Sequence, residues 1–107
     1  MDVFAALADP TRRDIVALLA AGERSAGDIS GRFDMAGPSV SRHLKVLRES
    51  GLIAYRREAT TRFYRLEEQK LAEARTWMDA QLKAVNAKFD RLGERLDAMK
   101  AREEGDG

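Results

Sequence analysis

Residues 37–51 read GPSVSRHLKVLRESG, and this stretch contains the signals of one complete amphipathic helix. Pro38 suits the first turn, where its missing N–H costs no hydrogen bond, and Gly51 suits the position just after the helix end. Val40, Leu44 and Leu47 recur at helical spacing and predict a buried side. The opposite side carries Pro38, Arg42, Lys45 and Glu49. The stretch therefore predicts a helix over 37–50 with one buried and one solvent-facing side.

Three shorter helices are predicted upstream of this stretch. Asp9 can act as the N-cap of a helix that begins at Pro10, and Gly22 suits the end of that helix. Ser25 can cap a third helix, with Asp28 at the acidic position of a capping box. Each helix has apolar residues at helical spacing: Val3, Phe4 and Leu7; Ile15, Leu18 and Leu19; Ile29 and Phe33.

A β-hairpin is predicted downstream of Gly51. Residues 52–58 and 61–66 are rich in β-branched, aromatic and basic side chains, which is typical of strands. Ala59 and Thr60 lie between them, without the Asn-Gly or Asp-Gly of a tight two-residue loop. We therefore expect a hairpin whose tip is longer than two residues or mobile.

A long helix is predicted over 67–102, followed by a polar tail at 103–107 that we expect to be disordered. Its apolar residues step alternately by four and three, a heptad repeat: Met78, Leu82, Val85, Phe89, Leu92, Leu96 and Met99. A helix of about 30 residues is about 45 Å long, which exceeds the body of so small a domain. Folding back onto its own core could cover 71–82 but hardly 89–99. We therefore predict that this stripe is a dimer seam.

The composition excludes several classes of protein. A chain of 107 residues favours one domain with a small core. The absence of cysteine removes disulfides, thiolate metal ligands and cysteine nucleophiles. The longest apolar run, Ile15–Ala21, is far shorter than the roughly 20 residues that span a bilayer, and the first residues lack the basic segment of a signal peptide. We expect a cytoplasmic protein with no membrane partner, metal or cofactor.

The formal net charge of +1 hides an uneven distribution of charge. Residues 1–36 carry −2, residues 37–66 carry +5, and residues 67–107 carry −2. A basic middle between mildly acidic flanks is typical of a protein that meets a polyanion with one surface. The alternative is a half-solvated segment that is basic by chance.

The predicted elements include two helices joined by a short loop and then a basic hairpin. This order predicts a winged helix-turn-helix over 1–66. With the long helix added, the fold is mostly α, in the order α-α-α-α-β-β-α. In that geometry the second helix enters the major groove of double-stranded DNA. Arg42 can contact guanine, and small residues nearby permit close approach. Alternatively, Arg42 is a solvated surface arginine with no role in binding, and Ser39 and Ser41 are present only because serine is common at the start of a helix. The candidate DNA-binding residues are Gly37, Ser39, Ser41, Arg42, Lys45, Arg48, Arg56, Arg57 and Arg62.

The motif LADPTRRDI at 7–15, PSVSRHLKVLRESGL at 38–52 and the basic residues around 56–66 together resemble the ArsR/SmtB family of winged-helix repressors. The resemblance implies a homodimer that represses transcription by binding a near-palindromic operator. It also implies dimerisation through the first helix, which contains Val3 and Phe4, and through the last. By position, Ser39, Ser41 and Arg42 would contact bases, and the hairpin arginines would contact the DNA backbone.

The chain departs from the family pattern at its sensing positions. Residues 25–27 read SAG where arsenic-sensing members have Cys-x-Cys, and the last helix has no histidine. The single histidine, His43, lies at the edge of the buried stripe of the recognition helix and has no partner ligand in the pattern. Ala36 replaces the usual serine cap of that helix. No metal site is therefore predicted.

The same residues give little support to other functions. An enzyme would need more than Ser39 and His43, which are one helical turn apart without a carboxylate placed by the pattern to orient the imidazole. A protein-interaction module need not keep the central +5 segment. Three kinds of regulator remain open within the DNA-binding interpretation: one that responds to a small apolar molecule at the dimer interface, one without any ligand, and a metal sensor with an unusual site. The lack of metal ligands disfavours the third.

Overall fold

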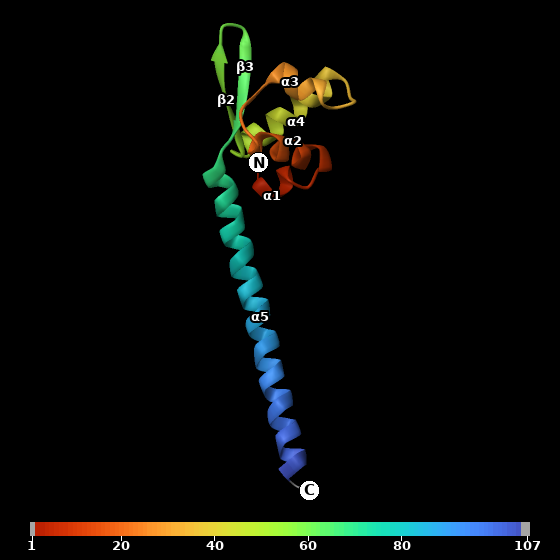
Figure 1. The fold of residues 1–107 in the computed structure, drawn as a ribbon, viewed down its shortest axis with the longest axis vertical. Helices are drawn as coiled ribbons and strands as arrows, with labels where there is room; N and C mark the ends of the chain where they lie inside the picture. The colour runs from red at the N-terminus through yellow and green to blue at the C-terminus, as the bar shows by residue number, and fades with distance from the viewer. Residues whose placement is uncertain (1, 106–107) are drawn as a thin grey trace. The chain divides into compact units, whose positions relative to one another are not determined.

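The computed structural model describes residues 2–105 (Figure 1). In chain order its elements are α1 (Val3–Ala6), α2 (Pro10–Ala20), β1 (Arg24–Ser25), α3 (Ala26–Gly31), α4 (Gly37–Glu49), β2 (Ile53–Glu58), β3 (Thr61–Leu66) and α5 (Glu68–Gly105). The fold is mostly helical with one small antiparallel sheet in the order β1-β3-β2. The predicted winged helix-turn-helix with a long C-terminal helix is confirmed.

The helix starts follow the capping residues of the sequence. Asp9 Oδ2 accepts a hydrogen bond from the Arg12 N–H at 3.0 Å, and Ser25 Oγ accepts one from the Asp28 N–H at 3.1 Å. Both predicted caps are confirmed. Helix α4 begins after Ala36, which supplies no side-chain cap, so the first amides of α4 have no side-chain acceptor at that position.

Helix α4 ends in a tight turn that leads into β2. The Ser50 hydroxyl donates to the Leu47 carbonyl at 2.7 Å and accepts from the Leu52 N–H at 3.3 Å. Gly51 then takes a φ of +85°, a conformation that glycine adopts without steric cost. The turn fixes where the hairpin leaves the recognition helix.

The hairpin differs from the expectation at its tip. Glu58 pairs with Thr61, so the connection is a two-residue turn of Ala59 and Thr60. Ala59 has a φ of +55°, in the left-handed region that costs a residue with a Cβ about 1–2 kcal/mol. The expected longer tip was therefore wrong, because alanine here tolerates a conformation for which glycine or asparagine is the usual sequence signal.

The sheet has a third strand that the sequence did not reveal. β1 consists of two residues and pairs antiparallel with β3, Arg24 with Tyr64 and Ser25 with Phe63. Two residues are too few to show the alternation by which strands are recognised. β1 joins the start of α3 to the hairpin.

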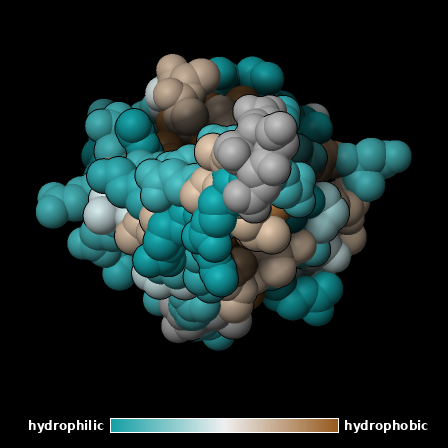
Figure 2. Space-filling model, turned by 90° about the horizontal axis from the view of Figure 1, so that it is seen from below, coloured by the Kyte–Doolittle hydropathy of each residue, from teal (hydrophilic) through white to brown (hydrophobic). Residues whose placement is uncertain are grey.

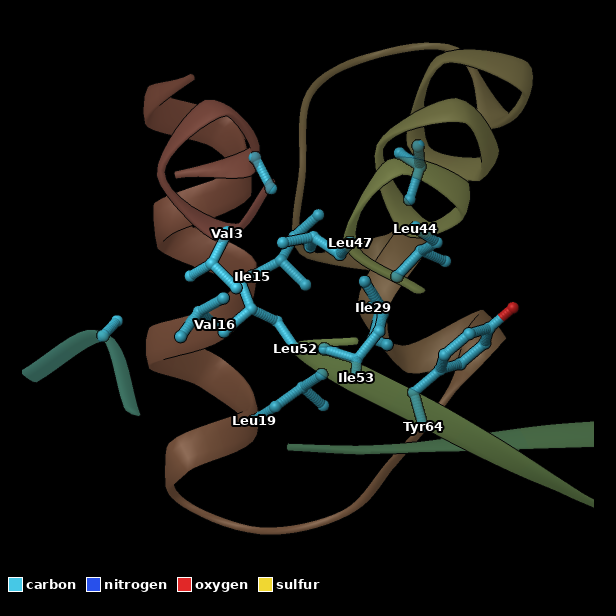
Figure 3. Close-up of a cluster of buried hydrophobic side chains, with 13 residues drawn as sticks. Val3, Ile15, Val16, Leu19, Ile29, Leu44, Leu47, Leu52, Ile53 and Tyr64 are labelled. Atoms are coloured by element: carbon cyan, nitrogen blue, oxygen red, sulfur yellow. The ribbon is translucent and has the colours of Figure 1, made fainter. Parts of the chain in front are cut away.

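The hydrophobic core lies within residues 2–74, where the helices and the sheet meet (Figure 3). Its largest fully buried side chains come from α2, α3, α4 and the start of the hairpin: Ile15, Ile29, Val40, Leu47, Leu52 and Ile53. Each such burial contributes about 1.5–3 kcal/mol. The predicted inner stripe of α4 is confirmed, since Val40, Leu44 and Leu47 are all buried.

The chain divides into two compact units after Ala74, inside α5 and not at its start, where the sequence analysis placed the boundary. In the second unit the heptad residues are exposed, from 45% at Val85 to 65% at Phe89. The helix continues to Gly105, so 103–105 are helical and not a disordered tail; 106–107 lie outside the described residues.

Polar side chains cover most of the face shown in Figure 2, with apolar patches between them. Among the helices of residues 2–105, none is both long and apolar enough to cross a membrane.

Candidate nucleic-acid interface

The outward side of α4 presents the residues that the sequence singled out. Ser41, Arg42 and Lys45 are exposed, and Ser39 is half-buried. The guanidinium of Arg42 donates to Ser39 Oγ at 3.3 Å, and Lys45 Nζ lies 4.0 Å from a Glu49 oxygen. Contacts this long at an exposed surface are weak. These side chains can exchange them for contacts with a ligand.

The start of α4 is open to close approach. A Cβ at Gly37 would meet no atom of the rest of the chain within 4 Å, so packing inside the protein does not require glycine there. Neighbouring Pro38 is exposed as well. The Ser39 and Val40 N–H groups donate to the Ala36 carbonyl at 2.9 and 3.2 Å, so what this helix end offers an anionic ligand is its open surface and the positive end of the helix dipole.

The hairpin has two faces that differ in charge. Its register sets Tyr55 opposite Tyr64, Arg57 opposite Arg62, and Arg56 opposite Phe63. Because side chains alternate along a strand, Tyr55, Arg57, Arg62 and Tyr64 share one face, and Arg56, Phe63 and Arg65 share the other. We call these the α4-side face and the outer face, because Arg48 of α4 lies against Tyr55, with its Cζ 5.1 Å from the ring centroid.

The arginines of the outer face are paired with carboxylates. Arg56 binds Glu23, with an Nη2–Oε1 distance of 2.7 Å, and Glu58, with an Nη1–Oε2 distance of 3.1 Å. The hydrogen bonds that Arg56 donates to Glu23 and, second, to Glu58 raise the pKa of Arg56 above its usual value. Arg65 lies 3.3 Å from Glu67. The outer face is therefore close to neutral.

The arginines of the α4-side face have no carboxylate partner. Across the described residues, no ion pair involves Arg48, Arg57 or Arg62. Arg62 instead lies over the Tyr55 ring at 4.8 Å, and hydrogen bonding with Tyr64 raises the pKa of Arg62. Three cations therefore remain available next to the outward side of α4.

This arrangement separates residues that the sequence had grouped. Arg56, Arg57 and Arg62 were predicted to act alike, whereas the structure places only Arg57 and Arg62 on the α4-side face. Two residues were missed, Tyr55 and Glu23. Strand alternation could have separated Arg56 from Arg57, but the uncertain tip left the pairing undetermined, and nothing local links Glu23 to a residue so far along the chain.

His43 packs against the start of α2. Its Nδ1 is 3.8 Å from Asp9 Oδ2 and 3.4 Å from Arg12 Nη1. The Arg12 backbone N–H and, to a lesser extent, nearby His43 keep the pKa of Asp9 below its usual value. Within residues 2–103 no three His, Asp or Glu side chains are grouped to hold a metal.

The Asp9 contact corrects one premise about catalysis. The sequence pattern placed no carboxylate beside His43, but Asp9 lies there. The distance of 3.8 Å is too long for a hydrogen bond, and Ser39 Oγ is engaged by Arg42. The cluster therefore does not form a catalytic triad.

A helix-turn-helix with an outward polar helix and a basic hairpin face beside it defines a winged-helix transcriptional regulator. Comparison with known proteins supports this class and narrows it. A family model described as "Bacterial regulatory protein, arsR family" matches residues 9–55. The transcriptional repressor SdpR of Bacillus subtilis is 39% identical over 77 residues, which cover 72% of this chain and 86% of that protein.

Solved structures give the same result. The crystal structure of an ArsR family transcriptional regulator matches with a TM-score of 0.70 and 32% identity, over 75% of this chain and 82% of that one. The transcriptional repressor BigR from Xylella fastidiosa matches with a TM-score of 0.60 and 38% identity, over 66% and 72%. The chain belongs to the ArsR family of bacterial regulatory proteins. It is a transcriptional regulator and not an enzyme.

Proposed function

We propose that the protein is a homodimeric repressor that binds a near-palindromic operator, with α4 in the major groove and the α4-side face of the hairpin against the adjacent DNA backbone. The observation that carries the proposal is the charge difference between the hairpin faces. Within the described hairpin, residues 53–66, the arginines without a carboxylate partner are Arg57 and Arg62, and both lie on the face that adjoins α4. Nucleic-acid affinity depends on such cations, which replace the counterions of phosphates.

Within this proposal the residues of the surface have different tasks. Ser39, Ser41 and Arg42 contact base edges near the start of α4, with Gly37 permitting close approach. Lys45, Arg48, Arg57 and Arg62 contact phosphates and fix the register on the duplex. We assign Arg56 a supporting task, because Glu23 and Glu58 neutralise it.

The heptad stripe of α5 supports the homodimer. Its seven apolar side chains are 45–65% exposed, and a single helix cannot bury its own stripe. A second copy offers an identical stripe, which a two-stranded coiled coil would bury. In α1, Phe4 is 39% exposed and Val3 is buried in the core at 9%. We assign the α1 contact to Phe4, with Val3 supporting it from beneath.

The direction of regulation rests on the relatives. SdpR and BigR carry the name of transcriptional repressors, and we propose the same effect for this chain. A regulator of this kind acts where the chromosome is, in the cytoplasm.

Selection of bound DNA from a random pool at two salt concentrations tests the proposal. We expect an enriched motif with two-fold symmetry, half-sites about one helical turn apart, and affinity that falls steeply with salt. Sedimentation of the free protein should give the mass of a dimer. An asymmetric motif, or no enrichment at either salt concentration, would contradict the proposal.

A further inference from the structure

Tyr55 occupies the place where the recognition helix and the hairpin meet. It is half-buried, and its ring centroid lies 5.5 Å from that of Tyr64. Two guanidinium groups lie against the same ring, with the Cζ of Arg48 at 5.1 Å and the Cζ of Arg62 at 4.8 Å. One arginine belongs to α4 and the other to β3, so a single ring connects both elements of the proposed DNA-binding surface.

Strand register and helix packing explain this convergence. Tyr55 pairs with Tyr64, and Arg62, two residues before Tyr64, is its diagonal neighbour on the same face. Arg48 is half-buried near the end of α4, and its contact with the Tyr55 ring places its side chain beside the hairpin.

An aromatic ring and a carboxylate hold an arginine with different electrical consequences. The ring attracts the cation through its quadrupole and leaves the positive charge uncancelled. A carboxylate cancels that charge, as Glu23 does for Arg56 on the outer face. Arg48 and Arg62 are therefore held in place and remain fully cationic.

We infer that Tyr55 is a positioning residue that holds Arg48 of the recognition helix and Arg62 of the hairpin as one preorganised phosphate-binding pair. The inference rests on the proposed DNA-binding function. Preorganisation strengthens binding, because long side chains that are already ordered lose less freedom when the ligand arrives. Tyr55 itself need not touch the DNA.

The test measures binding to a mixed-sequence DNA duplex of about 30 base pairs, since phosphate contacts do not depend on sequence. Tyr55→Phe keeps the ring and should bind within about twofold of the wild type. Tyr55→Leu removes the ring and should weaken binding about three- to tenfold. The dependence of log K on log salt concentration should stay unchanged in both, because no cation is lost.

Phe63→Leu is the matched control. Phe63 is also a half-buried hairpin aromatic with an arginine over its ring, Arg56 at 4.6 Å, but it lies on the outer face. This variant should bind DNA within about twofold of the wild type. A loss equal to that of Tyr55→Leu would show that any aromatic truncation loosens the hairpin, and it would overturn the inference.

A double-mutant cycle separates positioning from simple packing. Arg62→Gln should weaken binding and lower the salt slope by about one. Combined with Tyr55→Leu, the same change should cost clearly less, because the arginine is no longer positioned. Arg62→Lys keeps the charge without the planar guanidinium and leaves the ring intact. Because the Tyr55 ring also attracts an ammonium cation, Arg62→Lys should bind more tightly than Arg62→Gln when Tyr55 is present and should lose that advantage when Tyr55 is changed to Leu. A urea titration of Tyr55→Leu shows whether this variant is folded.

The outcomes also distinguish this inference from the proposed function. Tyr55→Leu binding as tightly as Tyr55→Phe, while Arg62→Gln weakens binding, would overturn the positioning of the arginines and leave DNA binding standing. Strictly additive losses in the cycle would do the same. A wild-type protein without salt-dependent duplex binding would overturn the proposed function, and this inference with it.

Discussion

Helices α4 and α5 both carry an apolar stripe, yet they use it in different ways. Leu47 of α4 is fully buried, whereas Leu96 of α5 is 55% exposed. The first stripe helps to form the core of residues 2–74 and leaves the polar side of α4 exposed. The second has no core in its own unit. The same residue type therefore serves folding in one helix and, by our proposal, association in the other.

The largest expected effect is on the free energy of unfolding, and it should differ between Leu47 and Leu96. Leu47→Ala should lower the free energy of unfolding by about 2–5 kcal/mol, because it leaves a cavity in a packed core. Leu96→Ala should act only through dimer dissociation, so its effect on the urea midpoint should depend on protein concentration. Urea titrations at two protein concentrations measure both. If both variants lost the same free energy of unfolding at both protein concentrations, the proposed difference between α4 and α5 would be wrong.

The second test addresses the α5 stripe directly. Phe89→Glu places a charge in the proposed seam and should raise the dimer dissociation constant about 100-fold or more. Analytical ultracentrifugation measures this constant. Ala87→Glu is the control, since position 87 lies off the stripe. An unchanged mass for Phe89→Glu would move the dimer interface elsewhere.

The third test concerns the outward side of α4. Arg42→Ala should cost about 1–3 kcal/mol of operator binding and relax preference at one base pair in each half-site. Arg57→Ala should weaken all sequences about equally and lower the salt slope by about one. Binding of both variants to the selected motif and to single-base changes in it gives the comparison. Equal losses on every sequence for Arg42→Ala would make Arg42 a phosphate contact.

The smallest effect should come from a helix end within residues 2–74. Asp9→Ala removes the α2 cap and should cost about 1 kcal/mol at neutral pH. Because the pKa of Asp9 is lowered in the folded protein, this stabilisation is present above the unfolded pKa of about 3.9 and is lost as the pH falls through the lower folded value. Urea midpoints of wild type and variant should therefore converge at low pH. A constant difference down to pH 2 would contradict this account.

Sequence reasoning succeeded where local signals are strong. The caps at Asp9 and Ser25, the stripe of Val40, Leu44 and Leu47, and the turn at Gly51 act within one or two helical turns, and all are found in the structure. The heptad residues of α5 were also placed on one helix. Their partner stays a prediction, since a single chain carries no record of what covers them.

Sequence reasoning failed where structure depends on distant or unusual partners. β1 has two residues and is defined by its pairing with Phe63 and Tyr64, not by a pattern of its own. The tip requires the left-handed backbone conformation of Ala59, and an alanine in the sequence does not indicate that conformation. Without the register, Arg62 could not be assigned to the same face as Arg57, and Glu23 could not be recognised as the partner of Arg56.

The short strand β1 contacts only one part of the hairpin, so the hairpin has a three-stranded root and a two-stranded end. It pairs with β3 only at Phe63 and Tyr64, and the adjoining Glu23 holds Arg56, so the root of the hairpin is fixed to the helix-turn-helix. Beyond that root, Arg57 and Arg62 lie on a ribbon of two strands, and such ribbons typically have a larger twist than wider sheets. The end of the wing can therefore differ in twist from its root, while the Tyr55 ring keeps Arg62 and Arg48 together beside α4.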